Sequence, residues 1–130
     1  MKVQTTLRIA AGDAHYGGDL VDGAYLLGVF GDLATEICIR QDGDEGLFRA
    51  YTSVEFLAPL HVGDYVEVTA ELLAVGRTSR RIRFSATKVI TARPDLRPSA
   101  AEVLSSPVTV ATAEGVVVVP SACQRLPGDS

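Results

Sequence analysis

Residues 20–39 limit the possible folds of this chain more than any other segment. Their sequence, LVDGAYLLGVFGDLATEICI, is apolar in almost every helical direction, and it ends at Arg40 and the turn-forming run QDGDEG. This pattern predicts a long helix that is buried all round. Gly23, Gly28 and Gly31 each cost about 1 kcal/mol of helix propensity relative to alanine. We therefore expect a sheet to wrap around this helix and pack closely against its backbone.

The rest of the sequence predicts five strands, at residues 3–10, 47–57, 65–74, 81–90 and 108–119. The third and fourth alternate apolar and polar residues, which is typical of two long antiparallel strands joined by a turn. The fifth is continuously apolar, which indicates a central strand or a subunit interface. The segment 92–107 is rich in Pro, Ser and Ala, so we expect a loop there with one helical turn at most.

This order predicts the α+β class, with an antiparallel sheet wrapped around one long central helix, as in the hotdog fold. The chain has 130 residues, of which 47% are hydrophobic, and that size suits one domain. We place the domain at residues 1–120 and expect a flexible C-terminal tail at 121–130. Such a sheet has exposed edges, so we expect a homo-oligomer, either a dimer or a trimer of dimers.

Charge and composition exclude several classes of partner. The net charge is −4 and the pI is near 5.1, so no nucleic acid partner is expected. The longest apolar segment contains Asp32 and Glu36, which argues against a membrane span. The N-terminus lacks the apolar stretch of a secretory signal, and we predict a cytoplasmic protein. Cys38 and Cys123 form no metal-binding motif, so we expect a core thiol, a tail thiol and no metal.

The densest cluster of unusual residues lies between the first strand and the helix. It contains Asp13, His15, Tyr16, Gly17 and Gly18. Glycines let backbone N–H groups approach a ligand closely, and a helix N-terminus favours negative charge, so this loop could form an oxyanion hole. In a Gly-rich turn, however, one Asp and one His more often only stabilise the turn itself. The residues alone do not decide between an oxyanion hole and an ordinary turn.

Two acids occur within the apolar helix. Asp32 and Glu36 have an i,i+4 spacing that puts both carboxylates on one helix face. Burial and mutual repulsion would raise at least one of their pKa values towards neutrality, which suits a general base or acid. The alternative is that this face meets solvent or pairs with arginines of another chain, and the sequence does not separate the two.

Other charged residues have less distinctive settings. Glu55 is expected on the strand face opposite Val54 and Phe56, where exposure to solvent is the simpler interpretation. Arg77 and Arg80 belong to a group of basic residues on and beyond the hairpin between the third and fourth strands. These arginines either face solvent or form a patch for phosphate groups such as those of coenzyme A.

Specific runs of residues resemble those of the β-aminoacyl-CoA ammonia-lyases, which act on β-alanyl-CoA and 3-aminobutyryl-CoA. The matching positions are Asp13 to Tyr16, Gly18, Leu20-Val21, Gly23-Ala24, Gly31-Asp32, Thr35-Glu36, Asp42 to Asp44, Leu47-Phe48, Tyr51, Glu55-Phe56, Ala58-Pro59 and Gly63-Asp64. The resemblance runs from about residue 7 to 120. Gly17-Gly18 and residues 42–48 are closer to the 3-aminobutyryl-CoA branch.

This resemblance implies a hotdog fold and a reversible elimination of ammonia from a 3-aminoacyl-CoA to give a 2-enoyl-CoA. It implies a reaction without a metal or prosthetic group. Coenzyme A takes part only as a portion of the substrate. Glu36 or Asp32 would be the base and the site for the substrate ammonium. The backbone of residues 16–18 would hold the oxyanion, and Asp13 would orient His15. Glu55 is shared with the family, which makes it a possible site residue.

Three alternatives stay open at this point. One is an acyl-CoA thioesterase, because many hotdog proteins use a carboxylate on the central helix to hydrolyse the thioester. A second is an acyl-CoA-binding module without catalysis. A third is addition of water in place of ammonia, although an acidic pocket favours an amine, which is positively charged at neutral pH.

Overall fold

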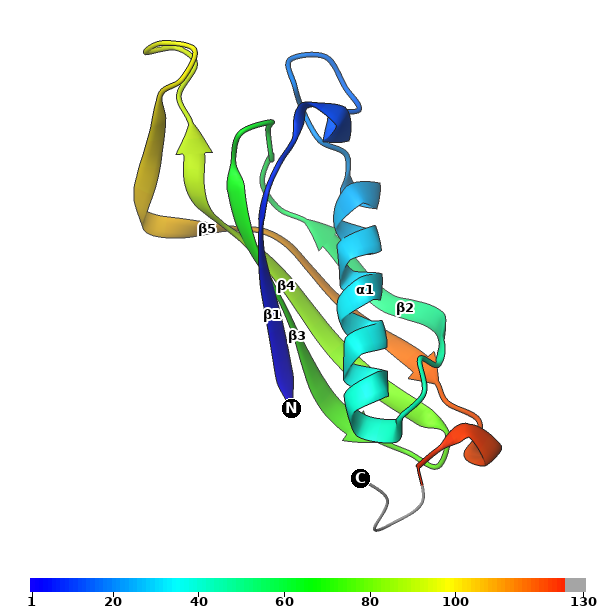
Figure 1. Ribbon diagram of the computed structural model, residues 1–130. Helices are drawn as coiled ribbons and strands as arrows, with labels where there is room; N and C mark the ends of the chain where they lie inside the picture. Colours follow the sequence, from blue (N-terminus) through cyan, green and yellow to red (C-terminus); the bar gives the residue numbers. More distant parts are fainter. Residues whose placement is uncertain (126–130) are drawn as a thin grey trace.

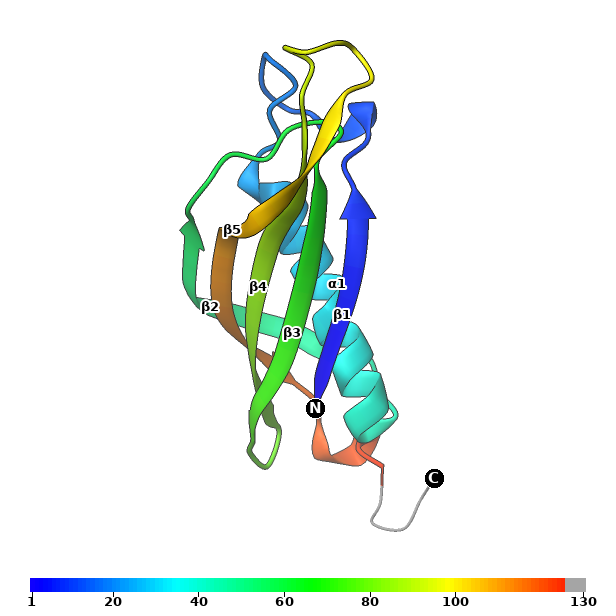
Figure 2. The same cartoon turned by 90° about the vertical axis from the view of Figure 1, so that its left-hand side faces the viewer.

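The computed structural model describes residues 1–125. Its main elements are β1 (Lys2–Arg8), α1 (Gly23–Asp42), β2 (Leu47–Phe56), β3 (Tyr65–Val75), β4 (Ser79–Ala92) and β5 (Ala101–Val118). The strands form one antiparallel sheet in the order β1-β3-β4-β5-β2, and α1 lies along its concave face (Figures 1 and 2). The predicted hotdog fold is confirmed. Within residues 1–125, no helix is long and apolar enough to cross a membrane.

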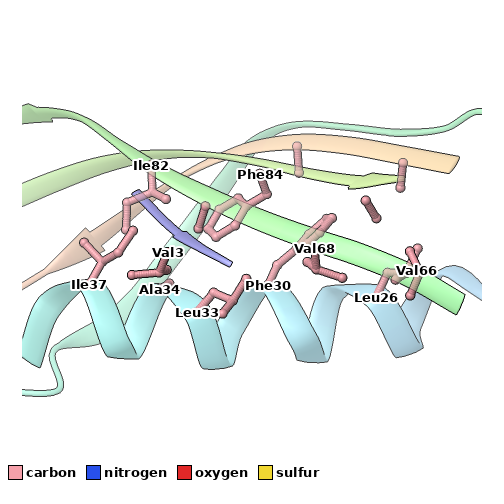
Figure 3. Packing of buried hydrophobic residues seen from close by; sticks show 14 of the residues in the cluster. Val3, Leu26, Phe30, Leu33, Ala34, Ile37, Val66, Val68, Ile82 and Phe84 are labelled. Carbon is pink, nitrogen blue, oxygen red and sulfur yellow. The ribbon is translucent and has the colours of Figure 1, made fainter. Parts of the chain in front are cut away.

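The core lies between one face of α1 and the sheet. Leu26, Phe30 and Ile37 point from the helix towards β3 and β4 (Figure 3), and the rings of Phe30 and Phe84 stack with centroids 5.1 Å apart. The prediction that the helix is buried all round was wrong for this chain. The sheet covers only one side, so the opposite face, formed by Ala24, Gly28, Asp32 and Ile39, is exposed.

The glycines of α1 have different surroundings. A Cβ atom on Gly23 would collide with the ring of Phe56, so this glycine does allow a close approach from β2. Cβ atoms on Gly28 and Gly31 would meet no atom within 4 Å. The expectation of close packing by the sheet therefore holds at the helix start only. The two remaining glycines lie on parts of the helix that this chain leaves uncovered.

Both ends of α1 lie three residues later than predicted. At the start, Leu20 forms a bridge with His61 and the N–H of Val21 donates to the carbonyl of Leu60 at 2.9 Å, which keeps these residues extended. At the end, the helix continues to Asp42 because Gly43, with φ of 73°, supplies the left-handed residue that closes it.

The segment between β4 and β5 differs most from the prediction. Residues 92–107 were expected to be a loop, but β4 continues to Ala92 and β5 begins at Ala101, so the two strands form a hairpin arm beyond the sheet (Figure 1). Pro94 lies in the tip of the arm. Pro107 lies in residues 104–107, where β5 bulges away from β4, and a residue without an N–H is tolerated there.

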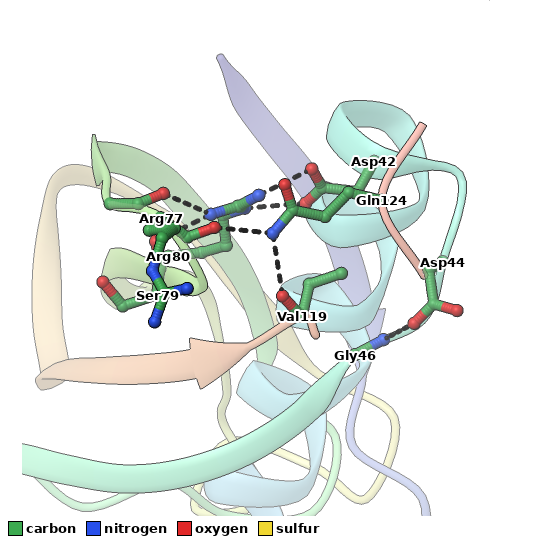
Figure 4. Close-up of polar contacts among 9 residues, drawn as sticks. Asp42, Asp44, Gly46, Arg77, Ser79, Arg80, Val119 and Gln124 are labelled. Atoms are coloured by element: carbon green, nitrogen blue, oxygen red, sulfur yellow. Dashed lines mark hydrogen bonds and ion pairs between the residues drawn. The ribbon is translucent and has the colours of Figure 1, made fainter. Parts of the chain in front are cut away.

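A buried ion pair closes the other end of the molecule (Figure 4). The guanidinium of Arg80, which is 2% exposed, donates to both carboxylate oxygens of Asp42 at 2.7 and 2.8 Å. It also donates to the carbonyls of Gly76 and Ser79, both at 2.9 Å. The hydrogen bonds to Asp42 raise the pKa of Arg80 above its ordinary value. This pair fastens the end of α1 to the β3–β4 turn.

The first residues after β5 pack against the same end. The side-chain amide of Gln124 donates to the carbonyls of Arg77 and Val119 at 2.7 and 2.9 Å, and the N–H of Arg125 donates to the carbonyl of Asp42 at 2.8 Å. The tail was expected to be loose from its beginning, yet residues 120–125 are held by these contacts. The remainder of the predicted tail, 126–130, lies outside the described residues.

Candidate active site

A stripe that includes three carboxylates and a phenol runs along one side of α1. Asp22, Tyr25, Val29, Asp32 and Glu36 follow a spacing of three and four residues, which places them on one helix face. Most of this stripe lines a groove of about 430 Å³ between α1 and the edge strand β1. The groove is also lined by Thr5, Leu7 and Leu33. It therefore combines an apolar floor with two carboxylates and a phenol.

The two predicted helix carboxylates are not buried in this chain. Asp32 is exposed and has no cationic partner within 4.0 Å among residues 1–125, whereas Glu36 accepts a hydrogen bond from Arg40 at 2.8 Å. The premise of desolvation by burial was therefore wrong, because the sheet covers the other side of the helix. Tyr25, which precedes them on the stripe, has a pKa raised by burial and by the nearby charge of Asp13, so its phenol stays protonated at neutral pH.

The loop before α1 is organised differently from the prediction. The carboxylate of Asp13 accepts the N–H of Ala10 at 2.9 Å, so it caps a turn and does not orient His15. The carboxylate near His15 belongs to Asp22, whose Oδ2 lies 3.7 Å from Nδ1 of the imidazole. Sequence reasoning missed Asp22, although its position just before Gly23 at the helix start was a signal that could have identified it.

The backbone donors of this loop are partly occupied. The N–H groups of His15 and Tyr16 both donate to the carbonyl of Leu20 at 3.0 Å, so Tyr16 cannot offer its N–H to a ligand. Within residues 1–125, the N–H groups of Gly17 and Gly18 make no such backbone contact. Gly18 has a φ of 70°, which favours glycine at this position. The predicted oxyanion site therefore narrows to the two glycines.

The start of α1 offers further donors. Asp22 occupies the N-cap position but makes no capping hydrogen bond, so its carboxylate does not satisfy the first N–H groups of the helix. Beside it lies a small cavity of about 60 Å³, lined by Asp22, Gly23, Leu26, Phe56 and other apolar residues. A carboxylate, free backbone donors and a small apolar cavity thus meet at one point.

The remaining predicted residues lie elsewhere. Glu55 is exposed on β2, where it pairs with Thr112 of β5. The alternation of side chains along the strand directs it away from α1, in agreement with the interpretation that it faces solvent. Arg77 lies in the exposed β3–β4 turn, in the same region as Asp42 at the end of α1 (Figure 4), and not at the helix start. Arg80 was predicted to bind substrate, and this was wrong, because its guanidinium is buried against Asp42.

Along α1, Asp32 lies nine positions after Gly23, and at 1.5 Å per residue this is about 13 to 14 Å. The helix start and the Asp32–Glu36 pair of one chain cannot act on the same small group of substrate atoms. Any single site that uses both must take them from different copies of the chain.

Comparison with known proteins shows which proteins this chain resembles in sequence and in fold. The sequence pattern of the Thioesterase superfamily matches residues 21–88. The 3-aminobutyryl-CoA ammonia lyase of Acetoanaerobium sticklandii is 53% identical over 125 residues, which cover 96% of this chain and 99% of that protein. The match therefore covers nearly the whole of this chain.

Solved structures agree with this comparison. The β-alanyl-CoA:ammonia lyase from Clostridium propionicum has a TM-score of 0.93 at 36% sequence identity, with 99% of this chain and 92% of that chain covered. A hexameric hotdog-fold thioesterase of Campylobacter jejuni has a TM-score of 0.73 at 15% identity, with 95% of this chain and 86% of that chain covered. At this identity the second likeness concerns the fold alone.

Proposed function

Since this chain belongs to the Thioesterase superfamily and, within it, to the β-aminoacyl-CoA ammonia-lyases, we propose that it catalyses the reversible elimination of ammonia from a 3-aminoacyl-CoA of the 3-aminobutyryl type. The product is the 2-enoyl-CoA. The observation that carries this conclusion is the 53% identity to a 3-aminobutyryl-CoA ammonia lyase over nearly the whole chain. The resemblance seen in the sequence is confirmed by that match and by the β-alanyl-CoA:ammonia lyase structure.

We propose that the active site forms between two copies of the chain. Strand β2 is a sheet edge with exposed apolar side chains, with Leu47 73% and Phe56 56% exposed, and a second β2 in antiparallel orientation would cover it. The hydroxyl of Tyr51, near the middle of β2, donates to the carbonyl of Leu27 at 3.2 Å, so the middle of the strand is level with Leu27 of the helix.

A two-fold axis through the middle of β2 would therefore be level with Leu27. The axis would place a residue that precedes Leu27 in one helix level with the residue that follows Leu27 by the same number of positions in the partner helix. Asp22 is five residues before this point and Asp32 is five residues after it. The helix start of one copy would then lie level with Asp32 of the partner subunit. The exposed small residues Ala24 and Gly28 would let the two helices approach closely.

The elimination assigns a chemical task to each part of this site. A carboxylate takes the proton from C2, the electrons of that C–H bond pass through an enolate and form the C2–C3 double bond, and the amine leaves C3 with the C–N electron pair. The N–H groups at the start of α1 and those of Gly17 and Gly18 would stabilise the enolate oxygen. Asp32, which has no cationic partner within residues 1–125, would hold the substrate ammonium.

The base is then one of the remaining acids of the stripe. Asp22 lies at the helix start beside His15, and Glu36 lies one turn beyond Asp32. Asp22 is closer to the proposed oxyanion donors, so we assign it as the base, with the imidazole of His15 3.7 Å from its carboxylate. Glu36, already paired with Arg40, is assigned to the edge of the ammonium site.

The test measures the reverse reaction, the addition of ammonia to crotonyl-CoA. The loss of enoyl absorbance gives the rate, and mass analysis identifies the amine adduct. Asp22→Asn and Asp32→Asn are each expected to lower kcat by about 100-fold or more in a folded protein. Release of free thiol is recorded in the same samples, since a thioesterase would produce it. Thiol release without an amine adduct would contradict the lyase assignment.

A mixing experiment tests whether the site is shared between copies. When the Asp22→Asn and Asp32→Asn chains are denatured and refolded together, half of the dimers are mixed and each holds one intact shared site. The mixture should therefore recover about a quarter of the wild-type activity. If each site lies within one chain, the mixture stays as inactive as its components. Glu36→Gln is refolded alone for comparison, because Glu36 is assigned only to the edge of the ammonium site.

The assembly and its place in the cell are also proposals. A homo-oligomer is supported by the two free sheet edges and by the hexameric thioesterase of similar fold, and light scattering of the purified protein measures its size. A cytoplasmic location is consistent with the composition, and fractionation of the source cells tests it.

A further inference from the structure

The reaction assigned above leaves the small cavity beside Asp22 without a role. Its volume is about 60 Å³, and it lies between the start of α1, the end of β2 and the middle of β5. Apart from Asp22, the side chains that border it within residues 1–125 are apolar, namely Val21, Leu26, Phe56, Ala58, Leu60 and Val110. A space of this kind suits a small hydrocarbon group.

Phe56 is the wall of this cavity that can be changed without disturbing the core. Leu26 and Val110 are 4% and 1% exposed, so both are fixed by core packing. The ring of Phe56 is 56% exposed and lies so close to Gly23 that a Cβ atom there would collide with it. The pairing of two β2 strands proposed above would cover the outer face of this ring and hold it against the helix start.

The volume of the cavity limits what it can hold. One water molecule takes about 30 Å³ in the liquid, and a methyl group is of similar size, so the cavity has room for about two such groups. A third would have to displace packed side chains, which is costly because protein interiors have little free space.

We propose that Phe56 is a specificity-determining residue, which closes a cavity for the substituent on C3 of the acyl group and limits that substituent to about two carbons. This inference rests on the proposed function and extends it to the length of the acyl chain. Acyl groups of four and five carbons fit the cavity, whereas an acyl group of six carbons or more does not.

The position of the cavity agrees with the assigned chemistry. Asp22, the assigned base, takes the proton from C2 and also borders the cavity. C3 is bonded to C2, so the first carbon of the substituent is only two bonds from the carbon that Asp22 deprotonates. The amine on C3 is assigned to Asp32 of the partner subunit. The apolar space beside Asp22 is then left for the hydrocarbon substituent, which gains by leaving water.

The experiment compares ammonia addition to three thioesters that differ only in the substituent on C3. Acryloyl-CoA has none, crotonyl-CoA has one carbon and 2-hexenoyl-CoA has three. In the wild type, kcat/KM for crotonyl-CoA is expected to exceed that for 2-hexenoyl-CoA by about 100-fold, because one methylene too many in an apolar pocket costs about 10- to 200-fold. Phe56→Ala should lower this preference by about tenfold or more.

Two further variants separate a change in cavity size from a general weakening of the site. Leu57→Ala removes a side chain that is 54% exposed from the next position, which does not border the cavity, and should leave the preference unchanged. Ala58→Val adds two methyl groups to the wall and should lower kcat/KM for crotonyl-CoA relative to acryloyl-CoA by about tenfold. An unchanged preference in Phe56→Ala, or an equal change in Leu57→Ala, overturns the inference while the lyase assignment stands.

Calorimetric binding of butyryl-CoA and hexanoyl-CoA tests the cavity without catalysis, because these thioesters carry neither an amine nor a C2–C3 double bond. Phe56→Ala should strengthen the binding of hexanoyl-CoA relative to butyryl-CoA by about tenfold, since two more methylenes become buried, and Leu57→Ala should not. This result in a protein without lyase activity supports the cavity and refutes the proposed reaction. Equal effects of the two variants on binding overturn the cavity in either case.

Discussion

Replacing Arg80 with methionine separates a structural role from a substrate-binding role. Arg80 is 2% exposed and makes four hydrogen bonds, two of them to a carboxylate that is itself 6% exposed. Arg80→Met leaves Asp42 buried without its counter-ion, and loss of one partner of such a pair costs about 3 to 5 kcal/mol in the free energy of unfolding. For a chain of this length, we expect Tm to fall by about 10 to 20 °C.

The assay is urea or thermal unfolding at one fixed protein concentration, because assembly makes Tm depend on concentration. The double variant Arg80→Met, Asp42→Leu should recover most of the loss, since an apolar pair leaves no buried charge unpaired. Arg83→Gln breaks a pair whose side chains are 61% and 40% exposed and should cost less than about 1 kcal/mol. A loss below about 1 kcal/mol for Arg80→Met, or a raised KM without a change in stability, would refute the structural role.

Three other changes probe the fold and the proposed pairing. Gly23→Ala should destabilise the chain, because its Cβ would collide with Phe56, and the Phe56→Ala background should relieve part of the loss in the same unfolding assay. Gly28→Ala should stabilise an isolated chain by about 1 kcal/mol in denaturant, but should weaken the assembly measured by light scattering if a partner helix packs there. Burial raises the pKa of the Cys38 thiol from 9.0 to about 11, so the unfolded chain loses this proton at a lower pH than the folded chain. The free energy of unfolding should therefore fall as pH rises from 9 to 11. Cys38→Ala should show a smaller fall when unfolding is measured across this pH range.

Regular alternation made the β3–β4 hairpin predictable from the sequence. Val66 and Val68 on β3, with Ile82 and Phe84 on β4, are all buried, and polar residues lie between them. The interior position of β5, between β4 and β2, agrees with one of the two interpretations of its continuously apolar sequence, whereas the order of the strands in the sheet was not predicted. Local periodicity is reliable here because these strands have one face in the core and one face in solvent.

The errors arose where tertiary contacts decide the structure. Apolar residues on every side of α1 suggested burial by the sheet, but a sheet covers one side only, and the face at Gly28 and Ile39 is exposed in the single chain. Arg80 looked like its exposed neighbours Arg77 and Arg81, because no local signal shows that it pairs with Asp42, 38 positions earlier. The segment 92–107 contained three prolines, yet pairing with β4 extends it into a strand.

The strand order also determines when this chain can fold during synthesis. β2 ends at Phe56, but its one neighbour in the sheet among residues 1–125 is β5, which ends at Val118. A ribosome that has made β1, α1, β3 and β4 therefore holds a chain in which β2 has no strand to pair with. Closure of the sheet spans more than 50 residues of sequence, a long-range pairing of the kind that folds slowly. The protein must complete its fold after its last strand has left the ribosome, and until then the edge of β4 is open to unwanted pairing.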